Sequence, residues 1–266
     1  MDANARCRVA YVSFQSLAPQ PLSIAGKLSL PAGGPLTGAA VVICHGSDGV
    51  DGRGEFYAPA LHARGVATLE IDMWAARGTV RGALARPASP VETLPDAFGA
   101  LAFLAAQPEI DPARIGILGF SWGGVVSLLA STLRRQPDGG ATRFAAHAAN
   151  YPVCWAFQRL PAFNLAQRTG APILIQTGEA DAYDTPGAGE RLVQSMGGGA
   201  AAVTGIAYTG ATHGFDRDLP AQTIIDPFAH DGAGGPVLMQ FDPAAAAAAQ
   251  QATAAFFEKA LAPAPL

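Results

Sequence analysis

The sequence has few cysteines and few charged residues, and each scarcity excludes a class of protein. Its three cysteines, Cys7, Cys44 and Cys154, lie far apart in 266 residues, which argues against a disulfide framework and favours reduced thiols in a cytoplasm. Charged residues make up only 14% of the chain and hydrophobic residues 50%, so the chain is not disordered and can fill a large core. We therefore predict a globular, cytoplasmic protein.

Runs of like charge and long apolar runs are also missing. The net charge of −4 is spread along the chain, so no patch favours nucleic acid or a membrane surface, and a small-molecule partner is expected. No window approaches the ~18 apolar residues that a membrane span requires. Residues 1–12 lack the charged start and apolar stretch of a secretion signal. His, Cys, Asp and Glu show no metal-ligand spacing, so a metal-dependent hydrolase is not expected.

Hydrophobic periodicity indicates an α/β fold. Two stretches with strand-like alternation, 9–13 and 22–30, predict an antiparallel pair at an edge. Continuous apolar runs, typical of strands covered on both faces, follow at 39–44, 66–71, 115–120, 144–149, 173–177 and, more weakly, 203–208. Helical spacing occurs at 55–64, 91–104, 125–135, 189–196 and 244–261. This alternation predicts a doubly wound, mostly parallel sheet with helices on both faces, and residues 1–266 are expected to form one domain.

Residues 117–124 read Ile-Leu-Gly-Phe-Ser-Trp-Gly-Gly, in which a predicted strand runs into the pattern Gly-x-Ser-x-Gly. This spacing places the serine on a strained turn between a strand and a helix, and the two glycines let neighbouring backbone approach closely. The positive end of the following helix favours a developing negative charge. Ser121 is therefore the predicted nucleophile.

A serine hydroxyl needs a base within hydrogen-bond reach to become reactive. His213 follows the weak strand 203–208 in a turn-rich loop and is the predicted base. His230 is the alternative, although no predicted strand leads into its loop. His147 lies within an apolar strand and is expected in the core.

The base in turn needs an acid that fixes its tautomer. Asp181 and Asp184 both follow the strand 173–177, at the end where catalytic groups collect in parallel sheets. We predict Asp181 as this acid on loop reach, and Asp184 stays the alternative because it can also cap the next helix.

Acyl transfer also requires two backbone N–H groups directed at the carbonyl oxygen. The residue after the nucleophile, Trp122, is the first predicted donor. Ser47, in the loop Cys-His-Gly-Ser-Asp-Gly after the strand 39–44, is the second, and His45 is expected to hold that loop in place.

These motifs together resemble the dienelactone hydrolase family of the α/β-hydrolase superfamily. The matching segments run in family order at 45–49, 70–78, 111–124, 151–154, 178–181 and 213–215. The resemblance implies the α/β-hydrolase fold and a cofactor-free hydrolase that uses Ser121, Asp181 and His213.

The chain departs from this family at two positions. The archetypal members carry a cysteine where this chain has Ser121, and a glutamate near the position of Gly46. The difference favours a serine carboxylesterase, with lactones as possible substrates, over a dienelactone hydrolase in the strict sense. The family's substrate-binding arginines have no match residue by residue; Arg53, Arg77 and Arg81 are candidates, and solvated surface arginines are the simpler interpretation.

The Gly/Pro-rich segments 78–90 and 219–236 are too long for simple connections and are expected to shape a pocket. Aromatic residues are predicted to line it: Trp74, Trp122, Tyr151, Trp155, Phe157, Tyr183 and Phe215.

The predicted function is hydrolysis of a small ester or lactone through an acyl-enzyme on Ser121. Two alternatives remain open at this point: a peptidase or acyltransferase on the same three residues, and an idle scaffold that only binds a ligand.

Overall fold

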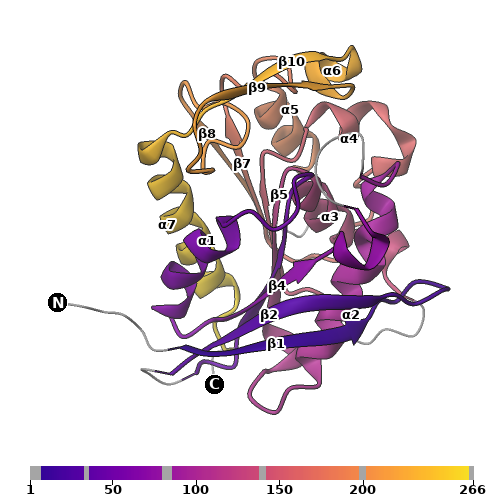
Figure 1. The fold of residues 1–266 in the computed structure, drawn as a ribbon, viewed down its shortest axis with the longest axis vertical. Helices are drawn as coiled ribbons and strands as arrows, with labels where there is room; N and C mark the ends of the chain where they lie inside the picture. The colour runs from indigo at the N-terminus through magenta and orange to yellow at the C-terminus, as the bar shows by residue number, and fades with distance from the viewer. Residues whose placement is uncertain (1–6, 33–35, 80–85, 138–141, 198–201, 264–266) are drawn as a thin grey trace.

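The central sheet holds eight strands in the order β1-β2-β4-β3-β5-β6-β7-β8 (Figure 1). This computed structural model describes residues 7–32, 36–79, 86–137, 142–197 and 202–263. The strands are β1 (Cys7–Gln15), β2 (Ser23–Pro31), β3 (Ala40–Cys44), β4 (Ala67–Asp72), β5 (Ile115–Phe120), β6 (Ala146–Asn150), β7 (Ile173–Gly178) and β8 (Val203–Tyr208). β1 and β2 are antiparallel, and β3 to β8 run parallel to one another. The predicted fold class, an α/β-hydrolase fold with a mostly parallel sheet and an antiparallel N-terminal edge, is confirmed.

The strength of each strand's apolar pattern in the sequence follows from how deeply the strand is buried. Every residue of β3, β5 and β6 is buried, because helices cover both faces of the sheet there. β8 is the last strand at the opposite edge from β1, and its residues are only partly buried or exposed. Its apolar pattern is correspondingly weak.

Helices cover both faces of the sheet. α1 (Arg53–His62) and α7 (Pro243–Ala260) pack on one face, and α2 (Leu94–Ala105), α3 (Trp122–Ala130) and α5 (Ala188–Ser195) pack on the other (Figure 1). Within the described ranges, no helix combines the length and apolar character needed to cross a membrane.

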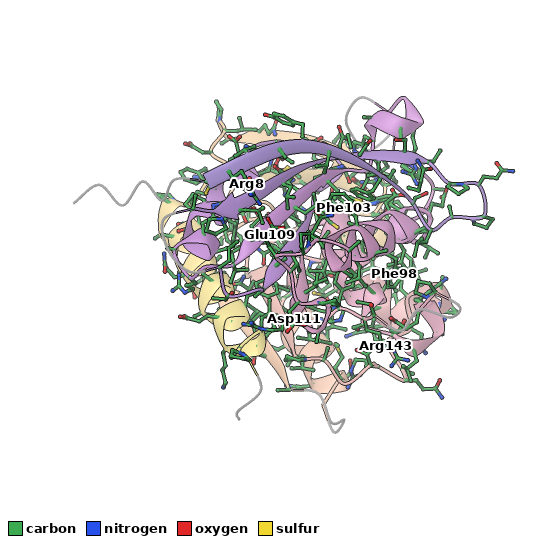
Figure 2. The ribbon with its side chains drawn as sticks, turned by 90° about the horizontal axis from the view of Figure 1, so that it is seen from below. Arg8, Phe98, Phe103, Glu109, Asp111 and Arg143 are labelled. Atoms are coloured by element: carbon green, nitrogen blue, oxygen red, sulfur yellow. The ribbon has the colours of Figure 1, made fainter. Side chains whose placement is uncertain are left out.

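The antiparallel edge is fastened to α2. Phe14 of β1 stacks on Phe103 of α2 with ring centroids 5.5 Å apart. Arg8 of β1 forms an ion pair with Glu109, which follows α2, and Figure 2 shows the two side chains together at this edge. The contacts hold the first strands against the body of the sheet.

Two predicted segments differ from the structure. The helix expected at 125–135 begins at Trp122 and ends at Ala130, and a separate 3₁₀ turn covers Leu133–Arg135. The expected loop 219–236 contains β9 (Gln222–Asp226) and α6 (Ala229–Gly232), and β9 pairs with β10 (Gly235–Met239). The glycines of this segment indicated a loop in the sequence, and the hairpin was therefore not predicted. In the structure Gly232, Gly234 and Gly235 have positive φ and let the chain reverse between the two strands.

α4 (Trp155–Arg159) was not predicted at all, because its five residues are too few to show a helical period. It is followed by a 3₁₀ turn at Pro161–Phe163. In Figure 1, α4 lies with α5, α6 and the β9–β10 hairpin at one end of the molecule.

Candidate active site

The turn between β5 and α3 holds Ser121 in a strained conformation. Its φ of 51° and ψ of −108° lie outside the regions that serine ordinarily adopts. A Cβ on Gly119 would lie 1.9 Å from the carbonyl oxygen of Gly123, and one on Gly123 would lie 2.1 Å from that of Cys44. Only glycine fits at these two positions, which is the physical reason for the Gly-x-Ser-x-Gly spacing.

Three side chains that are distant in sequence converge at this turn. His213 Nε2 lies 2.9 Å from Ser121 Oγ. His213 Nδ1 lies 2.7 Å from Asp181 Oδ2. A proton on Nδ1 directed at the carboxylate leaves Nε2 free to accept the serine proton, as a general base requires.

The imidazole is fixed by the rings around it. His213 is 1% exposed, with the ring of Tyr183 at 4.2 Å and the ring of Tyr151 at 4.9 Å between centroids. Asp181 accepts a second hydrogen bond, at 2.9 Å, from the backbone N–H of Tyr183. Both oxygens of this buried carboxylate therefore have donors, and the base cannot turn away easily.

The structure does not bring the alternative residues to Ser121. His230 is exposed, and its Nε2 lies 2.9 Å from the carbonyl oxygen of Pro236. Asp184 accepts the backbone N–H groups of Cys154 and Trp155 at 2.8 and 2.7 Å, so it binds the start of α4. The expectation that Asp184 caps the following helix is wrong, because Gly187 is the N-cap of α5 and no side chain caps that helix.

The loop after β3 is held in place around Ser47. The indole N–H of Trp74 donates to the Ser47 carbonyl oxygen at 3.0 Å, and Arg86 Nη1 donates to Ser47 Oγ at 2.7 Å. His45 Nε2 accepts the backbone N–H of Met73 at 2.9 Å. Burial lowers the pKa of His45 to about 4, so this ring is neutral and can accept that bond.

Trp122 is the first residue of α3, so its backbone N–H has no carbonyl one turn earlier in the helix to bond. Ser47 and Trp122 both line the same pocket as Ser121. The two predicted donors and the nucleophile therefore lie around one cavity.

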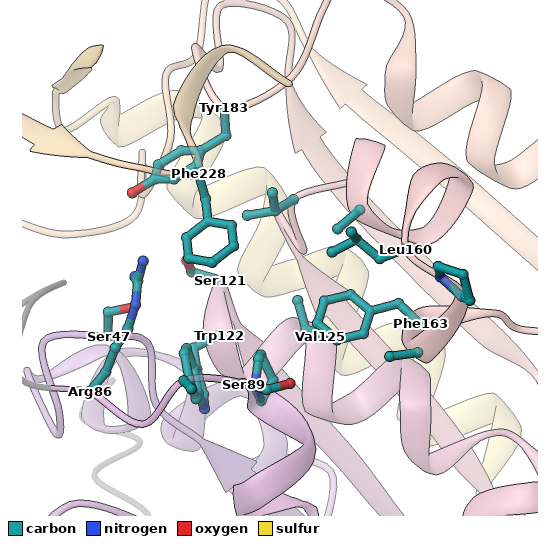
Figure 3. A pocket seen from close by; sticks show the side chains of 16 residues that line it. Ser47, Arg86, Ser89, Ser121, Trp122, Val125, Leu160, Phe163, Tyr183 and Phe228 are labelled. Carbon is teal, nitrogen blue, oxygen red and sulfur yellow. The ribbon is translucent and has the colours of Figure 1, made fainter. Parts of the chain in front are cut away.

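A cavity of about 260 Å³ opens beside Ser121, and we call it the apolar pocket (Figure 3). Its walls are mainly hydrocarbon: Val125, Val153, Ala156, Leu160, Phe163 and Phe228. Figure 3 shows Val125, Leu160 and Phe163 on one side of Ser121, with Arg86 and Ser47 on the other. α4 and the 3₁₀ turn after it supply the far wall, so the helix that the sequence did not announce shapes this pocket.

A much smaller cavity, of about 30 Å³, meets Ser121 on the side of His213, and we call it the charged niche. Four charged side chains line it: Asp48, Arg53, Arg217 and Asp226. These charges are paired, since Arg217 lies 2.8 Å from Asp48 and Asp226 lies 3.0 Å from Arg86.

Most of the aromatic residues predicted for the pocket serve elsewhere. Tyr183 lines both cavities and Trp122 lines the apolar pocket. Trp74 supports Ser47, and the indole N–H of Trp155 donates to the carbonyl oxygen of Phe228 at 3.1 Å. Phe157 is buried against Phe163.

Tyr151 and Phe215 are fully buried beneath the site and line neither cavity. The Tyr151 hydroxyl donates to the buried carboxylate of Asp216 and accepts from Arg53 Nη1 at 3.1 Å. Phe215 packs its ring on Tyr151 at 5.4 Å. Pattern alone cannot separate an aromatic side chain above a sheet from one packed below it.

The candidate arginines fall into different environments. Arg53 is 4% exposed, binds Asp51 at 2.8 Å and lines the charged niche, so the simpler interpretation as a surface residue is wrong for it. Arg77 binds Asp96 at 2.6 Å and lines neither cavity. Arg81 lies outside the described residues.

Arg86, which the sequence analysis missed, is the arginine at the mouth of the apolar pocket. It lies over the rings of Trp122 and Phe228 at 5.6 and 5.2 Å. The only signal for it was its place in the Gly/Pro-rich segment 78–90.

Comparison with known proteins identifies a matching family. The family model described as "Dienelactone hydrolase family" matches residues 56–261. Two uncharacterized proteins of Mycobacterium tuberculosis, from strains CDC 1551 and H37Rv, are each 30% identical over 172 residues, which is 59% of this chain. This chain spans 57% of the length of each of these relatives.

Solved structures share the fold at low sequence identity. A putative dienelactone hydrolase from Klebsiella pneumoniae is 18% identical, with a TM-score of 0.63 over 93% of this chain and 98% of that one. The dienelactone hydrolase-like promiscuous phosphotriesterase P91, from metagenomic libraries, is 20% identical, with a TM-score of 0.65 over 94% and 98%. Esterase 2 of Thermogutta terrifontis, solved after phosphorylation by paraoxon, is 17% identical, with a TM-score of 0.67 over 98% and 96%.

Proposed function

Because this chain belongs to the dienelactone hydrolase family, we propose that it is a serine hydrolase that cleaves small carboxylic esters, lactones included, through an acyl-enzyme on Ser121. The observation that carries the proposal is the continuous path from Ser121 Oγ to His213 Nε2 at 2.9 Å and from His213 Nδ1 to Asp181 at 2.7 Å. The esterases among the structural neighbours support the same class of bond.

In this mechanism, His213 Nε2 takes the proton of Ser121 as Oγ attacks the ester carbonyl carbon. The tetrahedral intermediate collapses, the bond to the alcohol oxygen breaks, and the imidazolium returns the proton to the leaving alkoxide. A water molecule then attacks the acyl-enzyme with His213 again as base, which releases the acid and restores the serine. The carboxylate of Asp181 stabilises the imidazolium in both halves.

The backbone N–H groups of Ser47 and Trp122 would hold the carbonyl oxygen as it becomes negative. The amino terminus of α3 lies at the same place and favours that charge. Arg86 and Trp74 keep the Ser47 loop in position for this role.

The position of Gly46 supports a substrate other than a dienelactone. The archetypal family members carry a glutamate near this position, but a Cβ here would lie 2.7 Å from Arg53 Nη2. The guanidinium of Arg53 takes up the space beside Gly46, so a larger side chain would have to displace a buried ion pair.

We also propose that the protein acts in a reducing compartment such as the cytoplasm. Cys44 and Cys154 are buried thiols within the core, consistent with structural rather than disulfide roles. Cell fractionation with an antibody to the protein tests this, and recovery in a secreted fraction would contradict it.

Labelling with a fluorophosphonate probe tests the proposed nucleophile. The native protein should take up one probe on Ser121, located by mass spectrometry of its peptides, and should lose ester turnover in step with labelling. Ser121→Ala should abolish both, while Ser23→Ala, at an exposed position on β2, should change neither. Full ester turnover in a folded Ser121→Ala variant would end the proposal.

A further inference from the structure

Ser121 lies between two cavities that differ in size and in lining. The apolar pocket contains the predicted oxyanion donors Ser47 and Trp122 but not His213. The charged niche contains His213 but not Trp122. Ser47, Ser121 and Tyr183 line both, so the two cavities meet at the nucleophile.

The chemistry of ester cleavage assigns one half of the substrate to each cavity. The alcohol oxygen must face His213 Nε2, because that nitrogen returns the proton to it. The alcohol therefore leaves through the charged niche. With the carbonyl oxygen directed at Ser47 and Trp122, the remaining substituent of the carbonyl carbon, the acyl chain, points into the apolar pocket.

On the basis of the function proposed above, we infer that the substrates are esters of a medium-length apolar acid with a small alcohol. The walls of the apolar pocket carry hydrocarbon groups from Val125, Leu160 and Phe163. The niche, in contrast, is bounded by paired charges, and a hydrocarbon chain there would remove them from water without replacing their contacts.

The volumes of the two cavities limit the lengths of the acyl and alcohol chains. At about 30 Å³ for a water-sized group, the 260 Å³ pocket holds roughly nine such groups and the 30 Å³ niche holds about one. The pocket therefore has room for an acyl chain of about six carbons. The niche takes a methyl or ethyl group near its opening.

A pair of isomeric esters tests the assignment in the native protein. Ethyl hexanoate and hexyl acetate have the same composition, but the long chain lies on the acyl side in one and on the alcohol side in the other. Each methylene buried in an apolar site raises kcat/KM by up to about fourfold. We expect kcat/KM for ethyl hexanoate, measured by titration of released acid, to exceed that for hexyl acetate by at least about tenfold. Equal rates, or faster cleavage of hexyl acetate, would overturn the inference.

A variant of the pocket wall provides a second test. Val125→Phe should fill the pocket and lower the ratio of ethyl hexanoate to ethyl acetate turnover by about tenfold or more. The matched control is Val9→Phe, at a valine on β1 that is 47% exposed, which should leave this ratio unchanged. A ratio that Val125→Phe leaves unchanged, in protein that still unfolds cooperatively, would also contradict the inference.

The fluorophosphonate probe separates the two levels of failure. Protein that labels on Ser121 but favours hexyl acetate would retain the proposed function and lose only the assignment of the cavities. Protein that neither labels nor cleaves either ester would lose both.

Discussion

Glu70→Gln should stabilise the protein at alkaline pH and change its stability little at acidic pH. Glu70 lies on β4, directly opposite Lys27 of β2, but Lys27 Nζ bonds Glu55 at 2.7 Å instead. The carboxyl group packs on the start of α1, where a Cβ on Gly54 would lie 2.2 Å from Glu70 Oε1. Burial, with the nearby Lys27 acting in the opposite direction, raises the pKa of Glu70 to about 7.

The sign and size of the effect follow from proton binding. Between the ordinary pKa of 4.5 and the folded pKa of about 7, the folded protein holds a proton that the unfolded chain has lost. Stability therefore falls as pH rises through this window, and the whole penalty is present above it. At about 1.4 kcal/mol per pKa unit the penalty is at most about 3.5 kcal/mol, and water reaching the partly buried carboxyl reduces it to about 1–3 kcal/mol.

Urea unfolding followed by tryptophan fluorescence, at pH 4.5 and pH 8.5, checks this prediction. Glutamine keeps the shape of the side chain without the charge, so the variant should gain about 1–3 kcal/mol at pH 8.5 only. Glu55→Gln is the control of opposite sign, because the hydrogen bond from Lys27 lowers the pKa of exposed Glu55, and losing that carboxylate removes stability above its ordinary pKa. A Glu70→Gln variant that gains equally at both pH values, or loses stability at pH 8.5, would refute the reasoning.

Three further predictions concern the site. Asp181→Asn should lower kcat by about 10²–10⁴-fold with a far smaller change in KM, because His213 is no longer held in the tautomer that accepts the serine proton. Steady-state kinetics on a short-chain ester measures both constants, and a kcat within about tenfold of the native value would contradict this prediction. Gly123→Ala places a methyl group 2.1 Å from the Cys44 carbonyl oxygen, so unfolding free energy should fall by about 1–3 kcal/mol or more, and an unchanged urea midpoint would count against that clash. Arg86→Met leaves the carboxylate of Asp226, which is 1% exposed, without its cation; a loss of about 3 kcal/mol is expected, and Arg86→Met with Asp226→Asn should recover part of it.

The sequence indicated those parts of the fold that repeat a period or run long enough to show one. The strands at 115–120 and 203–208 coincide with β5 and β8 in the structure. α4, with five residues, and the β9–β10 hairpin, with strands of five residues each, are too short and too irregular for periodicity to detect. These short elements are the ones that bound the two cavities.

The same limit applies to the site. The strands that precede Ser121, Asp181 and His213 end at one edge of the sheet. The proximity of these residues could therefore be predicted from chain order and spacing. Tyr151 and Phe215 follow the same logic in sequence, yet both lie beneath the sheet edge, because the side of the backbone that each faces depends on packing. Tyr151 has a φ of 41°, a local conformation that no sequence pattern announced.

Buried histidines show a second way in which pattern is insufficient. His62 of α1 is only 9% exposed, and its Nε2 lies 2.9 Å from Thr68 Oγ1. His147 was expected in the core and is there, with burial lowering its pKa to about 4. The burial of His147 could be predicted because its strand is apolar, whereas the mixed sequence of α1 gives no sign that His62 is buried.

The hydrogen bonds from the first N–H groups of α4 to Asp184 connect the wall of the apolar pocket to the loop that carries Asp181. Asp184 lies three residues after Asp181 on one loop, and α4 begins the wall that ends at Phe163. An exchange of residues 155–163 for a different acyl chain must keep a main-chain N–H donor at position 155 beside that of Cys154, or the loop that carries Asp181 loses part of its anchor. Under the proposed mechanism, a change to this wall of the apolar pocket therefore also affects the position of the acid that orients the base.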